Sequence, residues 1–202
     1  MKGNNSKQLL LSILGVAILV VAVVGVSFAA FSYSKTGTKV NTITTGTITM
    51  SYVEGENAID LKNAMPMTDV NGKALTGDNN VFDFTVNATI TGTTTIDYAI
   101  TATKEPDSTL PESGVKVYLT DMDADADDQI LAPTLVSSLG KTTSSETSGA
   151  PVDQYKLTTG TFNATTTHKY RLRMWVADTY NVSGTSQTFK LRVNVYGKAA
   201  AQ

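Results

Sequence analysis

The chain has 202 residues, no cysteine, a formal net charge of -2 and a pI of about 5.3. The lack of cysteine excludes a disulfide framework, thiolate catalysis and cysteine-based metal sites. The lack of a basic stripe excludes a nucleic-acid partner. Threonine accounts for 32 residues, and its β-branched side chain favours strands. An O-glycosylated stalk is the alternative, but it would need many more than the five prolines present.

The N-terminal part of the chain carries an uncharged run, residues 9–31, that follows Lys2 and Lys7. A helix of this length is about 34 Å long, enough to cross a bilayer. The lysines before it place the N-terminus on the cytoplasmic side. The run therefore predicts contact with the membrane and an extracellular or cell-surface location for the rest of the chain.

Two fates remain open for this run. The apolar core of an ordinary signal peptide spans about 7–15 residues, so the greater length favours an uncleaved anchor. Ser27 and Ala29 are small residues at the two positions that a signal peptidase reads, which favours cleavage between Ala29 and Ala30. Residues 1–29 are thus predicted to be a signal peptide, the substrate of a signal peptidase, or a membrane anchor.

The first half of the exported part alternates between apolar and polar residues. Residues 30–41 are polar and are predicted to form an extended leader. The alternation predicts a strand at 42–53, a short strand at 59–61, a loop at 63–72 and a turn at 77–80. The clearest strand is 81–91, and with 94–103 it gives the pattern of a hairpin.

The second half repeats this pattern. Strands are predicted at 115–120, 154–157, 160–163, 166–176 and 188–196, loops at 106–114 and 135–149, the latter mobile in its second half, and an unstructured tail at 198–202. No helix of normal length is predicted after the apolar run. The chain is therefore expected to be an all-β protein, with residues 42–197 forming an antiparallel β-sandwich or jelly roll of about seven to nine strands.

An acidic run follows the strand at 115–120 and is the candidate metal site. Its alternate carboxylates offer the hard oxygen ligands that Ca²⁺ prefers. The candidate ligands are Asp121, Asp123, Asp125 and Asp127. The run is not an EF-hand, because Ala126 occupies the glycine position and Ala132 the position of the bidentate Glu. An irregular Ca²⁺ loop and a solvated acidic turn both remain open, and no other cofactor is expected.

Basic and aromatic residues alternate on one face of the last two predicted strands. If these strands pair, the side chains form a ladder that could bind a partner or a glycan; the alternative is cross-strand packing within the fold. The residues of this candidate partner surface are Arg171, Arg173, Trp175, Lys190 and Arg192, with Tyr196 beside them.

Catalytic motifs are missing from the sequence. There is no HExxH, GxSxG or P-loop pattern, and the single histidine, His168, is predicted to be a surface residue. The chain is therefore expected not to be an enzyme.

The end of the apolar run carries a family resemblance. The segment Ser27-Phe28-Ala29-Ala30-Phe31-Ser32, followed by Lys35-Thr36-Gly37 and Thr45-Gly46-Thr47-Ile48, resembles the start of TasA/camelysin proteins, whose signals are served by a SipW-type peptidase. The resemblance implies a jelly-roll sandwich, export from a Gram-positive-type bacterium and fibre formation in a biofilm matrix. It also implies donor-strand exchange, with residues 30–41 as the donor segment. Camelysin relatives carry a metallopeptidase label, which no motif in this sequence supports.

The expected function is that of an exported structural protein, a self-associating subunit of an extracellular fibre, biofilm matrix or surface layer. The alternative is a membrane-anchored, adhesin-like binding module that presents the face around Trp175 or the long loops.

Overall fold

Strands are the dominant secondary structure of the computed structural model. It describes residues 14, 16, 32–36, 43–45, 48–56, 59, 64–92, 94–123, 127–182 and 186–200. The chain divides into two units, residues 1–31 and residues 32–202. Within the first unit only Leu14 and Val16 are described, so the rest of the predicted export run and the cleavage position at Ala29 and Ala30 lie outside the described residues. Across the described positions, no helix has the length and apolar character needed to span a membrane.

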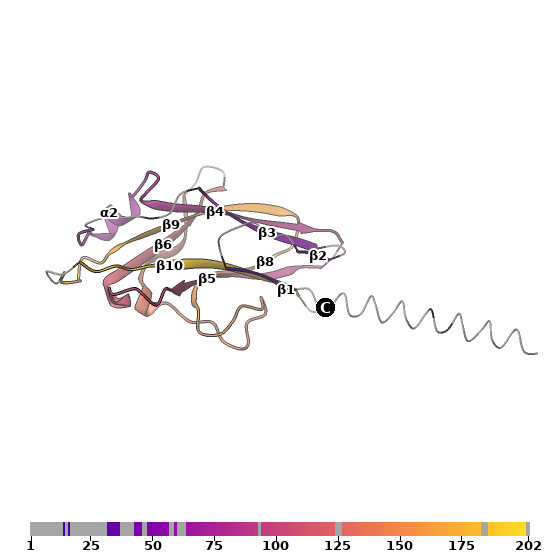
Figure 1. The fold of residues 1–202 in the computed structure, drawn as a ribbon. Coiled ribbons are helices and arrows are strands. Elements are labelled where there is room, and N and C mark those ends of the chain that lie inside the picture. Colours follow the sequence, from indigo (N-terminus) through magenta and orange to yellow (C-terminus); the bar gives the residue numbers. More distant parts are fainter. Residues whose placement is uncertain are drawn as a thin grey trace, which may run out of the picture. The chain divides into compact units, whose positions relative to one another are not determined.

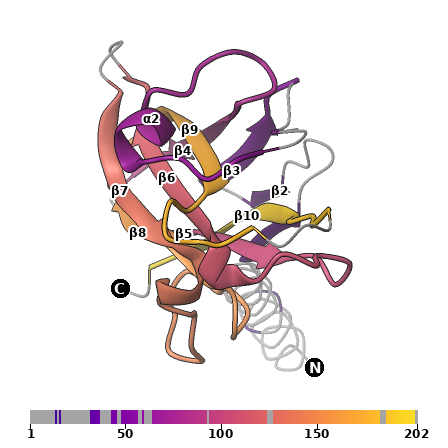
Figure 2. The ribbon, with the colours of Figure 1, turned by 90° about the vertical axis from the view of Figure 1, so that its left-hand side faces the viewer.

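The second unit contains two antiparallel sheets (Figures 1 and 2). The four-stranded sheet has the order β1 (Ser32–Thr36), β10 (Leu191–Ala199), β5 (Ile96–Lys104) and β8 (Tyr155–Phe162). The six-stranded sheet has the order β2 (Ile43–Thr45), β3 (Ile48–Glu54), β4 (Val81–Ile90), β9 (Thr166–Val176), β6 (Val115–Asp121) and β7 (Asp128–Leu135). The prediction of an all-β sandwich is confirmed for this unit.

The core lies between the two sheets. Phe84, Val86 and Ala88 of β4 are buried, and so are Tyr170 and Leu172 on the paired strand β9. Full burial of one large apolar side chain contributes about 1.5–3 kcal/mol before the loss of conformational entropy is subtracted. The alternation in the sequence therefore identified the inward faces of these two strands correctly.

A glycine allows the two sheets to approach each other closely. Gly197 of β10 faces Met50 of β3, and a Cβ atom at position 197 would overlap the Met50 sulfur. The strand β10 extends to Ala199, so the prediction of an unstructured tail from residue 198 is wrong for residues 198 and 199. Their strand conformation follows from pairing with Asp97 and Ile96 of β5.

The N-terminal half differs from the prediction in two places. Residues 42–53 contain a hairpin rather than one strand, because β2 pairs back on β3 with Thr45 opposite Ile48. Gly46 lies between these two residues, and glycine is favoured in two-residue connections of this kind. The predicted loop at 63–72 ends in a short helix, α2 (Asp69–Lys73). Thr68 caps the start of this helix, because its hydroxyl accepts a hydrogen bond from the backbone N–H of Asn71 at 3.5 Å.

Two smaller predictions fall beside these elements. The turn at 77–80 is confirmed, since Asn80 N donates to the carbonyl of Gly77 at 3.0 Å. Of the predicted short strand at 59–61, Ile59 lies outside any strand, and Asp60 and Leu61 lie outside the described residues.

The predicted hairpin between residues 81–91 and 94–103 is wrong. The strand β4 pairs with β3 and β9, whereas β5 pairs with β10 and β8 in the other sheet. The chain crosses between the sheets near Gly92, which has a φ of +95°. Two strands with inward apolar faces can pack face to face as well as pair edge to edge, and the alternation does not distinguish the two arrangements.

The C-terminal half also has an additional strand. The strand β7 is at the edge of the six-stranded sheet, where Pro133 costs no hydrogen bond to a further strand. Two predicted short strands merge into the single strand β8. In the predicted loop at 135–149, Thr142 is buried and its hydroxyl donates to the Pro151 carbonyl at 2.5 Å.

Candidate metal site

The acidic run joins β6 to β7 and divides its carboxylates between two side chains of β9. Asp121 and Asp123 lie beside His168, whereas Asp127 lies beside Arg173. Asp125 lies outside the described residues. The run therefore does not present Asp127 to the same point as Asp121 and Asp123, as the prediction of one Ca²⁺ loop required.

Three donor groups meet at the first location, which we call the Asp–Asp–His cluster (Asp121, Asp123 and His168). Their ligand atoms all lie within 4.8 Å of one another. The Nδ1 atom of His168 is 2.7 Å from Asp123 Oδ2 and 3.4 Å from Asp121 Oδ2. The three side chains are 26–33% exposed, so the cluster is accessible from solvent.

Backbone pairing between β6 and β9 brings the cluster together. Asp121 is opposite Tyr170 in the ladder, and the next residue, Met122, donates its N–H to the Lys169 carbonyl at 2.7 Å. His168 is on the inward side of β9, where its ring stacks on Phe162 at a centroid distance of 5.6 Å. The ring position is therefore fixed by the packing of the two sheets.

At the second location, Arg173 and Asp127 form an ion pair. The Arg173 guanidinium, 1% exposed as a residue, donates to Asp127 Oδ1 at 3.0 Å and to Oδ2 at 2.8 Å. It also donates to the Leu75 carbonyl at 2.9 Å and to the Thr120 hydroxyl at 3.2 Å. Burial by itself would raise the pKa of Asp127, but hydrogen bonds from Arg173 and Thr120 outweigh it and hold that pKa below its ordinary value.

The negative charge of the Asp–Asp–His cluster acts on a neighbouring phenol. Burial, a hydrogen bond with Tyr98 and the charges of Asp121 and Asp123 together raise the pKa of Tyr170 far above its ordinary value. Tyr170 is therefore a neutral phenol beside the cluster at any physiological pH.

His168 is the site residue that the sequence does not indicate as a ligand. Because no second histidine and no cysteine accompany it, the sequence predicts an isolated surface histidine. The sequence carries no signal for this contact, because it depends on the antiparallel pairing of β6 with β9, which places the end of the first strand beside the start of the second.

The candidate partner surface does not form. The strands β9 and β10 belong to different sheets, so the condition that they pair is not met. Arg173 and Trp175 are each 1% exposed, because the segment around α2 covers this face of β9 and Gly72 contacts the indole. Of the predicted surface residues, Arg173 and Trp175 therefore lie on a covered face of β9. Lys190 and Arg192 lie beside or on β10, in the other sheet.

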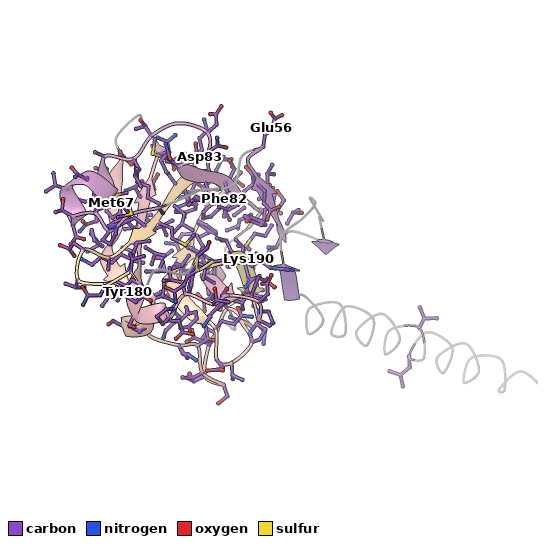
Figure 3. All side chains as sticks on the ribbon, turned by 60° about the vertical axis from the view of Figure 1, so that its left-hand side comes forward. Glu56, Met67, Phe82, Asp83, Tyr180 and Lys190 are labelled. Carbon is purple, nitrogen blue, oxygen red and sulfur yellow. The ribbon has the colours of Figure 1, made fainter. Side chains whose placement is uncertain are left out.

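The three other basic side chains of the candidate partner surface each pair with an acidic side chain. Arg171 binds Asp83 with N–O distances of 2.7 and 2.8 Å. On β10 and the residue before it, Arg192 pairs with Glu105 at 2.7 Å and Lys190 pairs with Asp107. Figure 3 shows Asp83 and Lys190 well apart on the sandwich.

Comparison of the chain with protein-family models, with curated proteins and with solved structures finds no match in any of the three.

Proposed function

We propose that this chain is an exported structural protein, a subunit of an extracellular fibre, biofilm matrix or surface layer that assembles by donor-strand exchange. The observation that carries the proposal is the position of β1. This strand, Ser32–Thr36, comes directly after the uncharged run and is an edge strand of the four-stranded sheet.

The pairing of β1 explains how exchange can work. The strand pairs with β10 alone, from Ser32 opposite Lys198 to Thr36 opposite Asn194. An edge strand that leaves exposes a row of unpaired backbone groups on β10, and the same strand from another copy can satisfy them. The contact is head to tail and does not close on itself, so repetition gives a filament.

The strand order supports the finer assignment of a jelly roll. Along the chain, β4 to β10 alternate between the sheets except for the consecutive pair β6 and β7. The resulting orders β1-β10-β5-β8 and β4-β9-β6-β7 are those of two Greek keys, to which the β2–β3 hairpin is added at one edge. In this arrangement β1 is the first strand of the roll and the strand freed by removal of residues 1–29.

Electron microscopy of two purified chains tests the proposal. The chain that starts at Ala30 should form filaments, and the chain that starts at Thr42 should not, because it lacks β1. Equal filament formation by both chains would remove the donor role.

A matched pair of variants tests the backbone contribution of the donor. Alternate residues of an edge strand point their N–H groups toward the neighbour, so proline at both Tyr33 and Ser34 removes at least one donor to β10. Alanine at the same two positions keeps both N–H groups and serves as the control. The proline pair should abolish filaments, and the alanine pair should retain them.

The alternative of a membrane-anchored binding module loses one of its two candidate surfaces, because the face around Trp175 is covered by the segment containing Gly72. Presentation of the long loops stays a prediction.

A further inference from the structure

The strongest unassigned feature of the molecule is the Asp–Asp–His cluster. Its donors are two carboxylate oxygens and one imidazole nitrogen, contributed by the end of β6, the turn after it and β9. Calcium takes six to eight ligands that are all oxygen, whereas imidazole suits zinc and its neighbours in the first transition row. The donor set therefore favours a transition metal over Ca²⁺.

The two carboxylates are oriented in the same way. Asp121 accepts the N–H of Asp123 on Oδ1 at 2.7 Å, and its Oδ2 faces His168. Asp123 accepts the N–H of Lys169 on Oδ1 at 3.0 Å, and its Oδ2 also faces His168. In each residue one oxygen is held by the backbone and the other is left to bind, as in the outer shell of metal sites.

The histidine nitrogen supplies an independent observation. Nδ1 of His168 is buried and has no hydrogen-bond partner, even though Asp123 Oδ2 is only 2.7 Å away. A simple His–Asp pair would direct an Nδ1 hydrogen at the carboxylate. Ligands of one metal instead direct their lone pairs at a common point, and bonds of about 2.0–2.2 Å place neighbouring ligand atoms about 2.8–3.1 Å apart at octahedral angles and about 3.3–3.6 Å apart at tetrahedral angles. The separation of 3.4 Å falls in the tetrahedral range, and that of 2.7 Å is just below the octahedral range.

We propose that Asp121, Asp123 and His168 bind a divalent first-row transition metal, of which Zn²⁺ is the test ion. The metal ties the connection between β6 and β7 to the start of β9. Three protein ligands leave a coordination position for water or for a donor atom from another molecule.

The single histidine makes the site directly observable. The full-length chain is produced without a histidine tag, labelled with ¹⁵N-histidine and kept in mild detergent, so that every imidazole signal comes from His168. Adding Zn²⁺ should shift these signals and saturate at one ion per chain. Asp121→Asn and Asp123→Asn should each weaken zinc binding about tenfold or more. Asp78→Asn, the same charge change at an exposed turn, should leave it unchanged.

Three results would overturn the proposal. They are an imidazole signal that does not move at millimolar zinc, Asp121→Asn and Asp123→Asn variants that bind zinc as tightly as the unmodified chain, and saturation by Ca²⁺ where Zn²⁺ fails. Emission from the single tryptophan, Trp175, which is buried in the fold, confirms that each variant is folded. The measurement does not depend on filament formation, so it stands or falls separately from the proposed function.

Discussion

Two side chains of the strand β9 bind opposite ends of the same acidic run, and they do so in different ways. Arg173 is 1% exposed and directs its donors to Asp127, Thr120 and the Leu75 carbonyl. His168 is partly exposed, and its Nδ1 atom lies between two carboxylates without a hydrogen bond. The Arg173 guanidinium therefore has several hydrogen-bond partners, whereas the Nδ1 atom of His168 has none.

The difference shows how one loop can serve stability and binding together. A buried guanidinium must keep its carboxylate, because removing one partner of a buried pair leaves an uncompensated charge. The carboxylates of Asp121 and Asp123 are partly exposed and solvated by water, so they carry no such requirement. Substitutions that change one cluster at a time show whether the other cluster responds.

The largest effect is expected from Asp127→Asn. Asparagine tolerates the positive φ of +38° at this position but removes the charge that Arg173 requires. The free energy of unfolding should fall by roughly 2–3 kcal/mol, a figure reduced because the Asp127 side chain is 46% exposed. Urea unfolding followed by Trp175 emission measures it. Asp128→Asn, at an exposed position on β7, should change stability by less than about 0.5 kcal/mol.

A smaller loss is expected when the cover over Arg173 is displaced. Gly72→Ala places a methyl group inside the contact distance of the Trp175 ring and should move α2 and the Leu75 carbonyl away from β9. Overpacking of this kind costs about 1–2 kcal/mol, and the Trp175 emission should shift to longer wavelength. Val70→Ala, at an exposed position of the same helix, is the matched control. Equal stability of the two variants would contradict the close packing of Gly72.

The pH dependence of the free energy of unfolding should report on the ion pair of Arg173 and Asp127. Because the pKa of Asp127 is lower in the folded chain than in the unfolded chain, its contribution is fully present above about pH 4. It is lost as the pH falls through the folded-state pKa. Urea midpoints measured from neutral to strongly acidic pH should therefore fall more steeply for the unmodified chain than for Asp127→Asn. Parallel curves would show that Asp127 does not carry this dependence.

The smallest effect on stability is expected from His168→Gln in the absence of metal. Its contacts with Asp121 and Asp123 are partly exposed, and such pairs contribute less than about 1 kcal/mol. Added Zn²⁺ should raise the thermal midpoint of the unmodified chain and leave that of His168→Gln unchanged. Lys169→Gln, which keeps the backbone N–H bound to Asp123, should respond to zinc like the unmodified chain.

Much of the strand pattern was predictable from the sequence. The strand at 166–176 was predicted with the bounds that the structure gives it, and its even-numbered residues from Tyr170 are largely buried. The strand β7 was missed because Pro133 and its half-exposed side chains weaken the alternation. The helix α2 was missed because five residues are too few to show a helical period.

The candidate site was only partly predictable for a related reason. The acidic run was recognised as a source of ligands, but its division between His168 and Arg173 depends on which strand pairs with β6. That pairing sets Asp121 opposite Tyr170 and leaves Asp127 within reach of Arg173. The sequence does not indicate whether an aspartate of this run will lie beside a histidine or an arginine. The register of the ladder between β6 and β9 decides it.

The sequence alone determined that the chain is a β protein and which side of β4 and β9 faces inward, because side chains of a strand alternate with a period of two. The tertiary structure decided which sheet each strand joins. It placed β4 and β5 in different sheets, separated β9 from β10, and covered Trp175 with α2. Alternation fixes the face of a strand but not its neighbour, since backbone hydrogen bonds are the same for every partner.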